Sequence, residues 1–430
     1  MRVFGRPKKQ SSDVFGISAE ILVDSYVDRG SLDAEIQKQL RRRNHIALRG
    51  ESKCGKSWIR KRNVPDAIVV QCRLKKTSAD IYKDILAELG ISIITEKSDK
   101  LTGATSVEVS GEMGRSIIAK IGAKLGASLA AEAANKYKVL GKGENDLKFI
   151  CEAIKASGRR VVIEDFHYMS VDERKAFSFD MKAMWDYETY LIVVGVWSQS
   201  NMLIYLNPDL SGRIEEISIY WSDEDLKAVI QKGSCALNVS FSVALASRLV
   251  EDSFGNAGLL QKLALNTLDE VDVTEEQENP LIIDNINAGE AAGMKYAEQL
   301  NPAYQQFAKR VSSGIRSRTD ATGIYAHAMA VIMGESDDDL KKGLDLHTIF
   351  AKANAKQPRI KKGNLRTVLE KFEGLQIDED GRGLVLSFNE ATDEIHVVDR
   401  QVLLYRKYAT VKWPWDNMIA EADGSEGYAD

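Results

Sequence analysis

The stretch NHIALRGESKCGKSWIRK, residues Asn44 to Lys61, decides how the rest of the chain is interpreted. Its apolar run Ile46, Ala47 and Leu48 is followed by Gly50, four residues separate this glycine from Gly55, and Lys56 and Ser57 follow at once. This is the spacing of a phosphate-binding loop that joins a strand to a helix. The stretch therefore predicts a nucleotide site.

Each residue type in this loop has a chemical task. The glycines let the backbone curl until successive N–H groups face a phosphate, and the start of the following helix adds positive charge. Lys56 would reach the β- and γ-phosphates of ATP, and the Ser57 hydroxyl would bind Mg²⁺. The predicted nucleotide contacts of the stretch are Gly50, Ser52, Lys53, Cys54, Gly55, Lys56, Ser57 and Trp58.

Composition limits the class of protein. A chain of 430 residues can form two or three domains, and 44% apolar with 28% charged residues is ordinary for a globular protein. A net charge of -5 argues against a generally basic coat for nucleic acid. Four widely spaced cysteines predict neither a disulfide framework nor a zinc site, and they favour a reducing, cytoplasmic setting. We see no apolar run long enough to span a membrane.

Residues 21–220 alternate short apolar runs with helical patterns, which predicts a parallel five-strand sheet flanked by helices. The predicted strands are HIALRG, DAIVVQCRL, RRVVIEDF, TYLIVVGVW and RIEEISIY. A Gly- and Ala-rich insertion at about 92–143 begins with a strand-like alternation, and its second part is either a small-residue helix or a hairpin. Residues 1–20 predict a solvated basic arm.

The second half of the chain is mainly helical. We expect a helical lid at 221–270, then a linker with an acidic start and a helical connector at 271–322, in which helices at 289–299 and 302–312 are separated. Residues 323–415 have helices followed by strand, turn, strand, turn and strand, which is the plan of a winged helix-turn-helix domain. The tail at 416–430 predicts disorder.

A strand that ends in carboxylates supplies the remaining groups for phosphate chemistry. VVIEDFH places Glu164 and Asp165 there, and by position Glu164 would hold Mg²⁺ while Asp165 would act as the base toward water. The usual order is Asp before Glu, so the assignment of the two roles stays open, and slow hydrolysis is expected. A γ-phosphate sensor would be Ser198, Gln199 or Asn201 after the next strand.

Arg213 precedes the last predicted strand, where a cation can complete the site of a neighbouring subunit as an arginine finger. The alternative is a surface arginine that pairs with Glu215 or Glu216.

These motifs together resemble the AAA+ and STAND ATPases. YVDRGSLDAEIQKQL is similar to the lead-in that lies beside adenine and ribose in those families, which implies that Val27 and Arg29 contact the nucleotide. The lid turn SFGNAGLLQKL has Gly258 where an arginine-bearing lid contacts the γ-phosphate, and this departure favours the STAND side. The resemblance covers about residues 26–268 and implies ATP and Mg²⁺ as cofactors, an ATPase activity and a homo-oligomer.

The winged helix has a cationic face. The DNA-contact candidates are Lys356, Arg359, Lys361, Lys362 and Arg366. Against DNA, the wing carries Asp378, Glu379 and Asp380, and in STAND-like proteins the winged helix often packs on the nucleotide as a lock.

We therefore predict a Mg²⁺-ATP-dependent switch in conformation and oligomerisation. By analogy alone it would be a sensor or regulator in bacterial defence against phage or mobile elements. The alternative is a DNA-binding ATPase of replication-initiation or transposition type that grips duplex DNA with the winged helix. A small-molecule kinase is disfavoured because the sequence shows neither residues for a pocket that would bind the phosphate acceptor nor a base that would activate it. The sequence leaves the trigger, the client protein and the oligomer size open.

Overall fold

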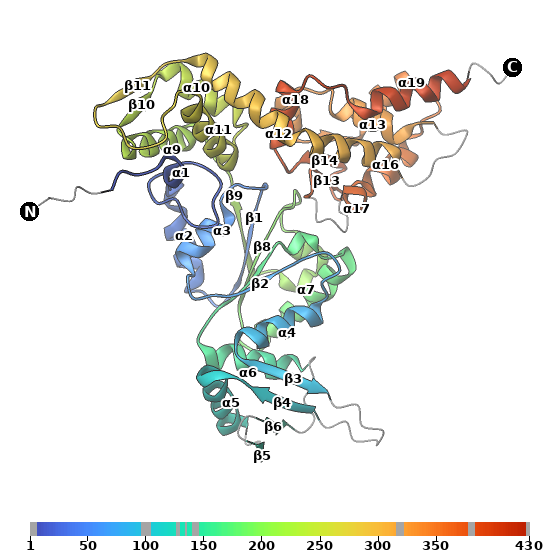
Figure 1. Ribbon diagram of the computed structural model, residues 1–430. Helices are drawn as coiled ribbons and strands as arrows, with labels where there is room; N and C mark the ends of the chain where they lie inside the picture. The colour runs from blue at the N-terminus through green and yellow to red at the C-terminus, as the bar shows by residue number, and fades with distance from the viewer. Residues whose placement is uncertain are drawn as a thin grey trace, which may run out of the picture.

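The computed structural model describes residues 7–95, 105–125, 130–133, 136–139, 146–314, 322–376 and 383–426. Figure 1 shows a sheet with flanking helices, a helical lid beside the N-terminal segment, and a C-terminal domain that a long helix joins to the lid. Within the described residues, none of the helices combines the length and apolar character that crossing a bilayer requires.

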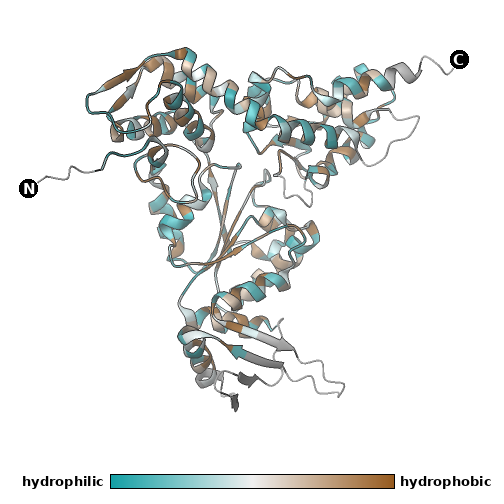
Figure 2. Cartoon of the chain, in the orientation of Figure 1, coloured by the Kyte–Doolittle hydropathy of each residue, from teal (hydrophilic) through white to brown (hydrophobic). Residues whose placement is uncertain are grey.

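A parallel sheet with the spatial order β2-β7-β8-β1-β9 forms the centre of the molecule. Its strands are β1 (His45–Gly50), β2 (Ile68–Gln71), β7 (Val161–Glu164), β8 (Leu191–Gly195) and β9 (Ile214–Ile219). Every residue of β7 and β8 is buried, because helices cover both faces of the sheet. Figure 2 shows the apolar colour concentrated in these strands. The five predicted strands are confirmed.

Helices before and between the strands cover this sheet. They are α2 (Leu32–Leu40), α3 (Lys56–Asn63), α4 (Ser78–Glu88), α6 (Leu147–Ser157), α7 (Val171–Asp186) and the short α8 (Met202–Leu206). Side chains define their starts: Thr77 and Asp80 form a capping box on α4, and Ser170 caps α7. Because all five strands run the same way, the loops after β1, β7 and β8 meet at one edge of the sheet.

The insertion forms a small α+β unit at the far end of the sheet, away from the winged helix (Figure 1). It contains β3 (Ile91–Thr95), β4 (Thr105–Val109), α5 (Gly111–Leu125), β5 (Ala130–Ala133) and β6 (Lys136–Val139). The strands pair antiparallel in the order β3-β4-β6-β5. The open choice between a helix and a hairpin is resolved as a helix followed by a hairpin.

The lid follows β9 and is helical, as predicted. It consists of α9 (Asp223–Ala236), α10 (Val243–Asp252) and α11 (Ala257–Glu270), with β10 (Val239–Phe241) paired in parallel to β11 (Leu281–Ile283). Ser222 and Asp225 form the capping box that starts α9. Asn256 caps α11 through the amide of Leu259, so the first turn of α11 is fixed where it meets the phosphate-binding loop.

The N-terminal segment packs against the lid, so the prediction of a solvated arm is wrong for residues 7–20. A short helix, α1 (Ser11–Val14), leads to Phe15, and both Val14 and Phe15 are fully buried in the lid core. Lys8 pairs with Glu275 and Glu278 of the acidic linker. The basic N-terminal segment and the acidic start of the linker thus contact each other. Burial of Val14 and Phe15 in the lid stabilises this arrangement.

One helix, α12 (Ile286–Ser313), replaces the two helices predicted at 289–299 and 302–312, the second of which was predicted to begin at Pro302. Proline removes one backbone hydrogen bond and normally breaks a helix. Here both halves bury residues of the shared core, Tyr296 before the proline and Tyr304 with Phe307 after it. This burial on both sides holds the helix continuous.

The C-terminal domain has the predicted winged-helix plan with an added strand. Its elements are α13 (Ile324–Ile332), α14 (Asp337–Lys342), β12 (Leu344–Asp345), α15 (Leu346–Lys356), α16 (Lys362–Glu370), α17 (Phe372–Gln376), β13 (Leu386–Asn389), β14 (Glu394–Val397), α18 (Gln401–Tyr408) and α19 (Pro414–Glu426). The strand order is β12-β14-β13. The first of the three strands predicted after the helices, which would begin at Leu375, is absent from the described residues there, because Leu375 and Gln376 end helix α17. Phe372 and Gln376, one helical turn apart, are both buried.

Two further predictions concern the ends of this domain. The acidic residues 378–380 lie outside the described residues. The tail predicted as disordered is helical as far as Glu426, because α19 anchors itself through the buried Trp415, which stacks on Trp413.

Candidate functional site

A cavity of about 260 Å³ lies at the edge of the sheet where the loops after β1 and β7 meet the lid and the N-terminal segment. The loop after β1 contributes Lys56 and Ser57, and the end of β7 contributes Asp165. The start of α11 and residues before α2 form the opposite wall. The sequence motifs predicted to bind nucleotide therefore converge on one hollow.

The two loop glycines are required for different reasons. Gly55 has φ +94°, a left-handed conformation that favours glycine. Gly50 has no positive φ, but a Cβ there would lie 2.7 Å from Cys54 Sγ and 2.8 Å from the Ile219 carbonyl oxygen. One glycine gives the turn and the other gives the close packing that forms the phosphate cradle at the start of α3.

Lys56 is buried beneath this cradle. Its Nζ donates to the Gly50 carbonyl oxygen at 3.0 Å and to that of Glu51. These bonds hold the ammonium group against the loop that it would share with a phosphate. Ser57, one residue further, also lines the cavity.

The two predicted carboxylates have different surroundings. Glu164 is 8% exposed, and its Oε1 accepts from Arg60 Nε and Nη2, each at 2.8 Å. Glu164 is not part of the cavity wall, whereas Asp165 is. Burial and the neighbouring Glu164 raise the pKa of Asp165, opposed by Lys56 and a hydrogen bond from Gln71. A carboxylate of raised pKa that faces the cavity suits a general base.

The cavity fits a magnesium nucleotide. Mg²⁺ prefers oxygen ligands and is usually held by one or two protein groups together with phosphate oxygens. Ser57, whose side chain carries a hydroxyl oxygen, is among the residues of the wall. Among the described residues there is no larger group of His, Cys, Asp and Glu that could hold a metal, so any Mg²⁺ would need the phosphates as further ligands.

The end of β8 contributes an apolar residue to the cavity wall. Val196 lines the cavity, and its amide donates to Nδ1 of His167 at 3.3 Å. Burial, Lys56 and Arg174 lower the pKa of His167 to about 3, so this ring is neutral. Of the three sensor candidates, Ser198 contacts Ser387 of the winged helix at 3.2 Å. The cavity wall includes none of the three, Ser198, Gln199 and Asn201.

The lid and the winged helix both hold the phosphate-binding loop. From the lid, the Gly258 amide donates to the Lys53 carbonyl oxygen at 3.1 Å, and Trp221 Nε1 donates to that of Cys54 at 2.9 Å. From the winged helix, the Val398 carbonyl oxygen accepts from the Ser52 amide at 3.0 Å. A residue later in the chain, Arg400, makes an ion pair with Glu51 of the loop.

Replacing Gly258 with alanine should push the lid off the loop. A Cβ at this position would lie 2.6 Å from the Lys53 carbonyl oxygen and 2.7 Å from Lys53 Cβ, and neither atom can move without the loop. We expect a loss of about 1–3 kcal/mol in the free energy of unfolding and weaker ATP binding, measured by urea denaturation and calorimetry. The control is Gly374→Ala, which meets no atom within 4 Å in helix α17. Equal effects of the two substitutions would contradict the close fit.

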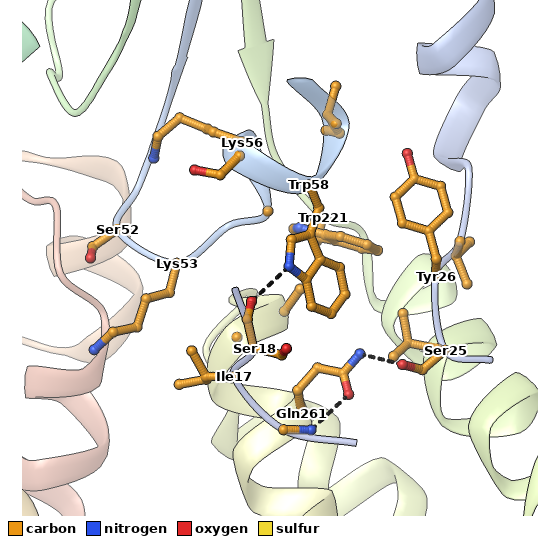
Figure 3. Close-up of a pocket in the computed structure, with 18 of the residues that line it drawn as sticks. Ile17, Ser18, Ser25, Tyr26, Ser52, Lys53, Lys56, Trp58, Trp221 and Gln261 are labelled. Carbon is orange, nitrogen blue, oxygen red and sulfur yellow. Dashed lines mark hydrogen bonds between the residues drawn. The ribbon is translucent and has the colours of Figure 1, made fainter. Parts of the chain in front are cut away.

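The remaining wall combines the aromatic rings of Trp58 and Tyr26 with polar side chains. Figure 3 shows Trp58 standing between Ser18 and Tyr26, with its Nε1 donating to the Ser18 carbonyl oxygen at 2.9 Å. Gln261 donates to Ser25 Oγ at 2.8 Å and accepts from the Gly16 amide at 3.3 Å. Val27 and Arg29 of the lead-in also line the cavity.

Arg213 lies at the opposite edge of the sheet from the phosphate-binding loop. Its carbonyl oxygen accepts from the amide of His45, the first residue of β1, whereas the loop follows the last residue. The guanidinium donates to the Asp209 carbonyl oxygen and stacks 4.9 Å from the centroid of the Trp185 ring. Arg213 therefore does not reach the cavity of its own chain, and a role in a neighbouring subunit stays a prediction.

The DNA candidates are divided by their partners. Arg366 pairs with Glu370 and Asp393, and Arg359 bonds to Gln357. Lys356, Lys361 and Lys362 are exposed. Lys361 and Lys362 at the start of α16 are therefore exposed, whereas the two arginines already have hydrogen-bond or ion-pair partners.

Sequence reasoning missed much of the cavity wall, including Ser18, Ser25 and Val196. Trp221 and Gln261 line the cavity from the lid, and Glu51 joins the loop to the winged helix. The signal for Trp221 was its place directly before the capping box of α9. Glu51 and Gln261 carry no pattern that distinguishes them from surface residues.

The chain was compared with protein-family models, curated proteins and solved structures, and only solved structures are similar to it. No protein-family model matches the sequence, and no curated protein matches it. The chain is similar to the solved structures of Cdc6p from Pyrobaculum aerophilum, with 11% identity, 98% of each chain covered and a TM-score of 0.36, and of the ORC1 protein from Aeropyrum pernix in complex with DNA, with 7%, 97% of each chain and 0.41.

A third similar structure is a signal-transduction ATPase with numerous domains from Pyrococcus horikoshii that has a tetratricopeptide repeat sensor. The identity is 11%, the match covers 92% of this chain and 44% of that one, and the TM-score is 0.36.

Proposed function

We propose that the chain binds and slowly hydrolyses Mg²⁺-ATP and that the nucleotide controls the docking of the winged helix. The observation that carries this proposal is the direct contact between the winged helix and the phosphate-binding loop, in which Val398 accepts from the Ser52 amide and Arg400 pairs with Glu51. Phosphate binding and winged-helix docking thus use neighbouring atoms of one loop.

Shared contacts of this kind couple two sites. A ligand shifts a conformational equilibrium only when it binds the two arrangements with different affinity. A phosphate in the cradle needs the loop amides, whereas the docked winged helix occupies the amide of Ser52. A nucleotide that rearranges this part of the loop would therefore change the stability of the docked arrangement, and docking would change nucleotide affinity by the same factor.

The residues of the wall have separate roles in hydrolysis. Lys56 would neutralise the β- and γ-phosphates, and the Ser57 hydroxyl with the phosphates would hold Mg²⁺, which supplies charge stabilisation at the transferring phosphoryl group. Asp165 would accept a proton from the attacking water. Glu164 would orient Arg60 and the end of β7, since its carboxylate is already engaged by that arginine.

Solution scattering tests the switch. We expect the radius of gyration of wild type to differ between ADP and a non-hydrolysable ATP analogue. Arg400→Met removes the ion pair that holds the winged helix on the loop, so we expect it to shift the radius of gyration of the unliganded protein toward the larger of these two values. Lys412→Met, a lysine after α18 outside these contacts, is the control. The proposed control of docking would be refuted if two results hold together. Wild type would scatter identically with ADP and with the ATP analogue, and unliganded Arg400→Met would scatter like unliganded wild type.

The Glu51 carboxyl should make stability depend on pH. Burial raises its pKa from 4.5 to about 7, although Arg400, Asn256 and Lys56 act in the opposite direction. The folded state then binds the proton more tightly than the unfolded state. The protonated Glu51 carboxyl therefore adds to the free energy of unfolding below pH 4.5, and this contribution is lost as the pH rises through 7. The full effect is on the order of 3 kcal/mol.

Urea denaturation of wild type and Glu51→Gln at several pH values between 4.5 and 8.5 measures this effect. We expect the free energy of unfolding of wild type, relative to the variant, to fall across this range and to level off above pH 8. A difference that does not change with pH would show that Glu51 keeps its ordinary pKa.

The wider role is proposed by analogy. A compact ATPase switch of this plan suits a sensor or regulator that changes its self-association, in defence against phage or mobile elements. Particle size with and without ATP would test the association. An adjacent effector or nuclease gene would support a role in defence, and an adjacent replication or transposition gene would contradict it.

DNA binding is the second candidate, favoured by the exposed Lys361 and Lys362 at the start of α16. We expect salt-dependent binding of duplex DNA to be lost when both lysines are replaced by alanine. Arg366→Ala should have a smaller effect, because this guanidinium already pairs with Glu370 and Asp393. Absence of binding by wild type at low salt would exclude this function.

A further inference from the structure

Arg29 is a buried cation that lacks an acceptor. It is 7% exposed, and its Nε and Nη2 atoms are buried without a hydrogen-bond partner. Within the described part of the chain, no carboxylate lies at ion-pair distance from this guanidinium. Burying a charge without a partner is costly, and such groups are rare in folded proteins. Arg29 also lines the cavity, so the missing acceptor belongs to whatever fills it.

The ring of Trp221 lies between Arg29 and the phosphate-binding loop and contacts both. Its Cζ lies 3.8 Å from the centroid of the Trp221 ring, and the same indole donates from Nε1 to the Cys54 carbonyl oxygen. A Cβ on Gly55 would lie 4.0 Å from this indole. The guanidinium is therefore stacked beside the loop just before the start of α3, where nucleotide phosphates are expected.

The lid leaves this part of the cavity without a cation. Gly258 faces the loop so closely that a Cβ would lie 2.6 Å from the Lys53 carbonyl oxygen, so no longer side chain fits there. Gln261, the next polar lid residue in the wall, already bonds to Ser25 and to the Gly16 amide. Lys56 is bonded to two loop carbonyls. Arg29 is the buried cation of the wall whose donors are still available.

We propose that Arg29 binds a phosphate group of the nucleotide and supplies from the N-terminal side the charge that the lid lacks. The ligand class is a nucleoside di- or triphosphate, because a guanidinium fork matches two phosphate oxygens. This inference rests on the proposed nucleotide binding, and it assigns Arg29 to the phosphates and not to the adenine or ribose that the resemblance implies.

Calorimetry with three triphosphates tests the assignment. Arg29→Met keeps an unbranched stem that can pack on Trp221 but removes the charge and the donors. We expect it to raise the Kd by about 10- to 100-fold, and by the same factor for ATP, inosine triphosphate and 2′-deoxy-ATP in Mg²⁺. Arg29→Lys should recover part of the loss. A loss absent or clearly smaller with either analogue would place Arg29 on the base or the ribose and overturn the proposal.

Arg62→Met is the matched control. Arg62 also stacks on an aromatic ring, 4.7 Å from the centroid of Tyr26, but it pairs with Asp33 and lies outside the cavity wall. We expect its Kd values to match those of wild type. We also expect the thermal midpoint of unliganded Arg29→Met to stay at or above the wild-type value, because no hydrogen bond is lost.

The remaining outcomes also decide the proposal. Unchanged binding by Arg29→Met would overturn the phosphate role and leave the proposed nucleotide site standing. Wild type that binds none of the three triphosphates would end both. A fall in the thermal midpoint of the unliganded variant, with unchanged triphosphate binding, would show that Arg29 only supports the fold.

Discussion

Replacing Lys56 with alanine raises the Kd for ATP by at least about 100-fold. The ammonium group is the charge predicted to meet the β- and γ-phosphates, and the structure places it on the Gly50 and Glu51 carbonyl oxygens inside the loop. The substitution therefore removes both the charge and an internal brace of the cradle. Titration calorimetry with ATP and ADP in Mg²⁺ measures the effect.

Lys38→Ala is the control for this result. Lys38 is exposed on α2 and lies outside the cavity wall, so its removal changes the net charge equally without touching the site. We expect wild-type Kd values from it. ATP binding by Lys56→Ala within a few-fold of wild type would mean that the loop is not a nucleotide site.

Replacing Asp165 with asparagine should stop hydrolysis and leave binding nearly unchanged. Asp165 faces the cavity, and burial together with Glu164 raises its pKa, which favours proton acceptance. Asparagine keeps the shape of the side chain but cannot take the proton. We expect the turnover rate to fall by about 10²- to 10⁴-fold, measured as phosphate release at saturating ATP. The control is Asp66→Asn, an exposed carboxylate before β2.

Glu164→Gln separates the roles of the two neighbours. Its carboxylate balances the buried Arg60, so the neutral amide should lower the free energy of unfolding by about 3 kcal/mol in addition to any effect on hydrolysis. Asp165→Asn should leave this free energy nearly unchanged. If Asp165→Asn hydrolyses ATP at the wild-type rate while Glu164→Gln does not, the base is Glu164 and our assignment is reversed.

The sheet could be predicted from the sequence because its strands are buried on both faces. Runs such as VVIE and LIVVG need no tertiary information to be recognised, and all of their residues are buried in the structure. The phosphate-binding loop was predictable for a related reason, since the positions of Gly50 and Gly55 are fixed by backbone geometry.

The rest of the site depends on contacts between distant segments. Arg60 sits in a run of basic residues, and nothing in its spacing indicates that its guanidinium meets Glu164 on another element. In the same way, Glu51 meets Arg400 across almost the whole length of the chain. Pairing of this kind follows from the fold, so the sequence alone could not assign the Mg²⁺ and base roles between Glu164 and Asp165.

The continuous helix α12 joins the lid to the winged helix, so a rotation of the lid would be passed along its length (Figure 1). A helix of 28 residues is about 42 Å long. A rotation of about 10° at the lid would then displace the far end by roughly 7 Å, which is more than one helical turn. Pro302 removes one hydrogen bond partway along the helix, and bending at that point would reduce the share of a lid rotation that reaches the winged helix.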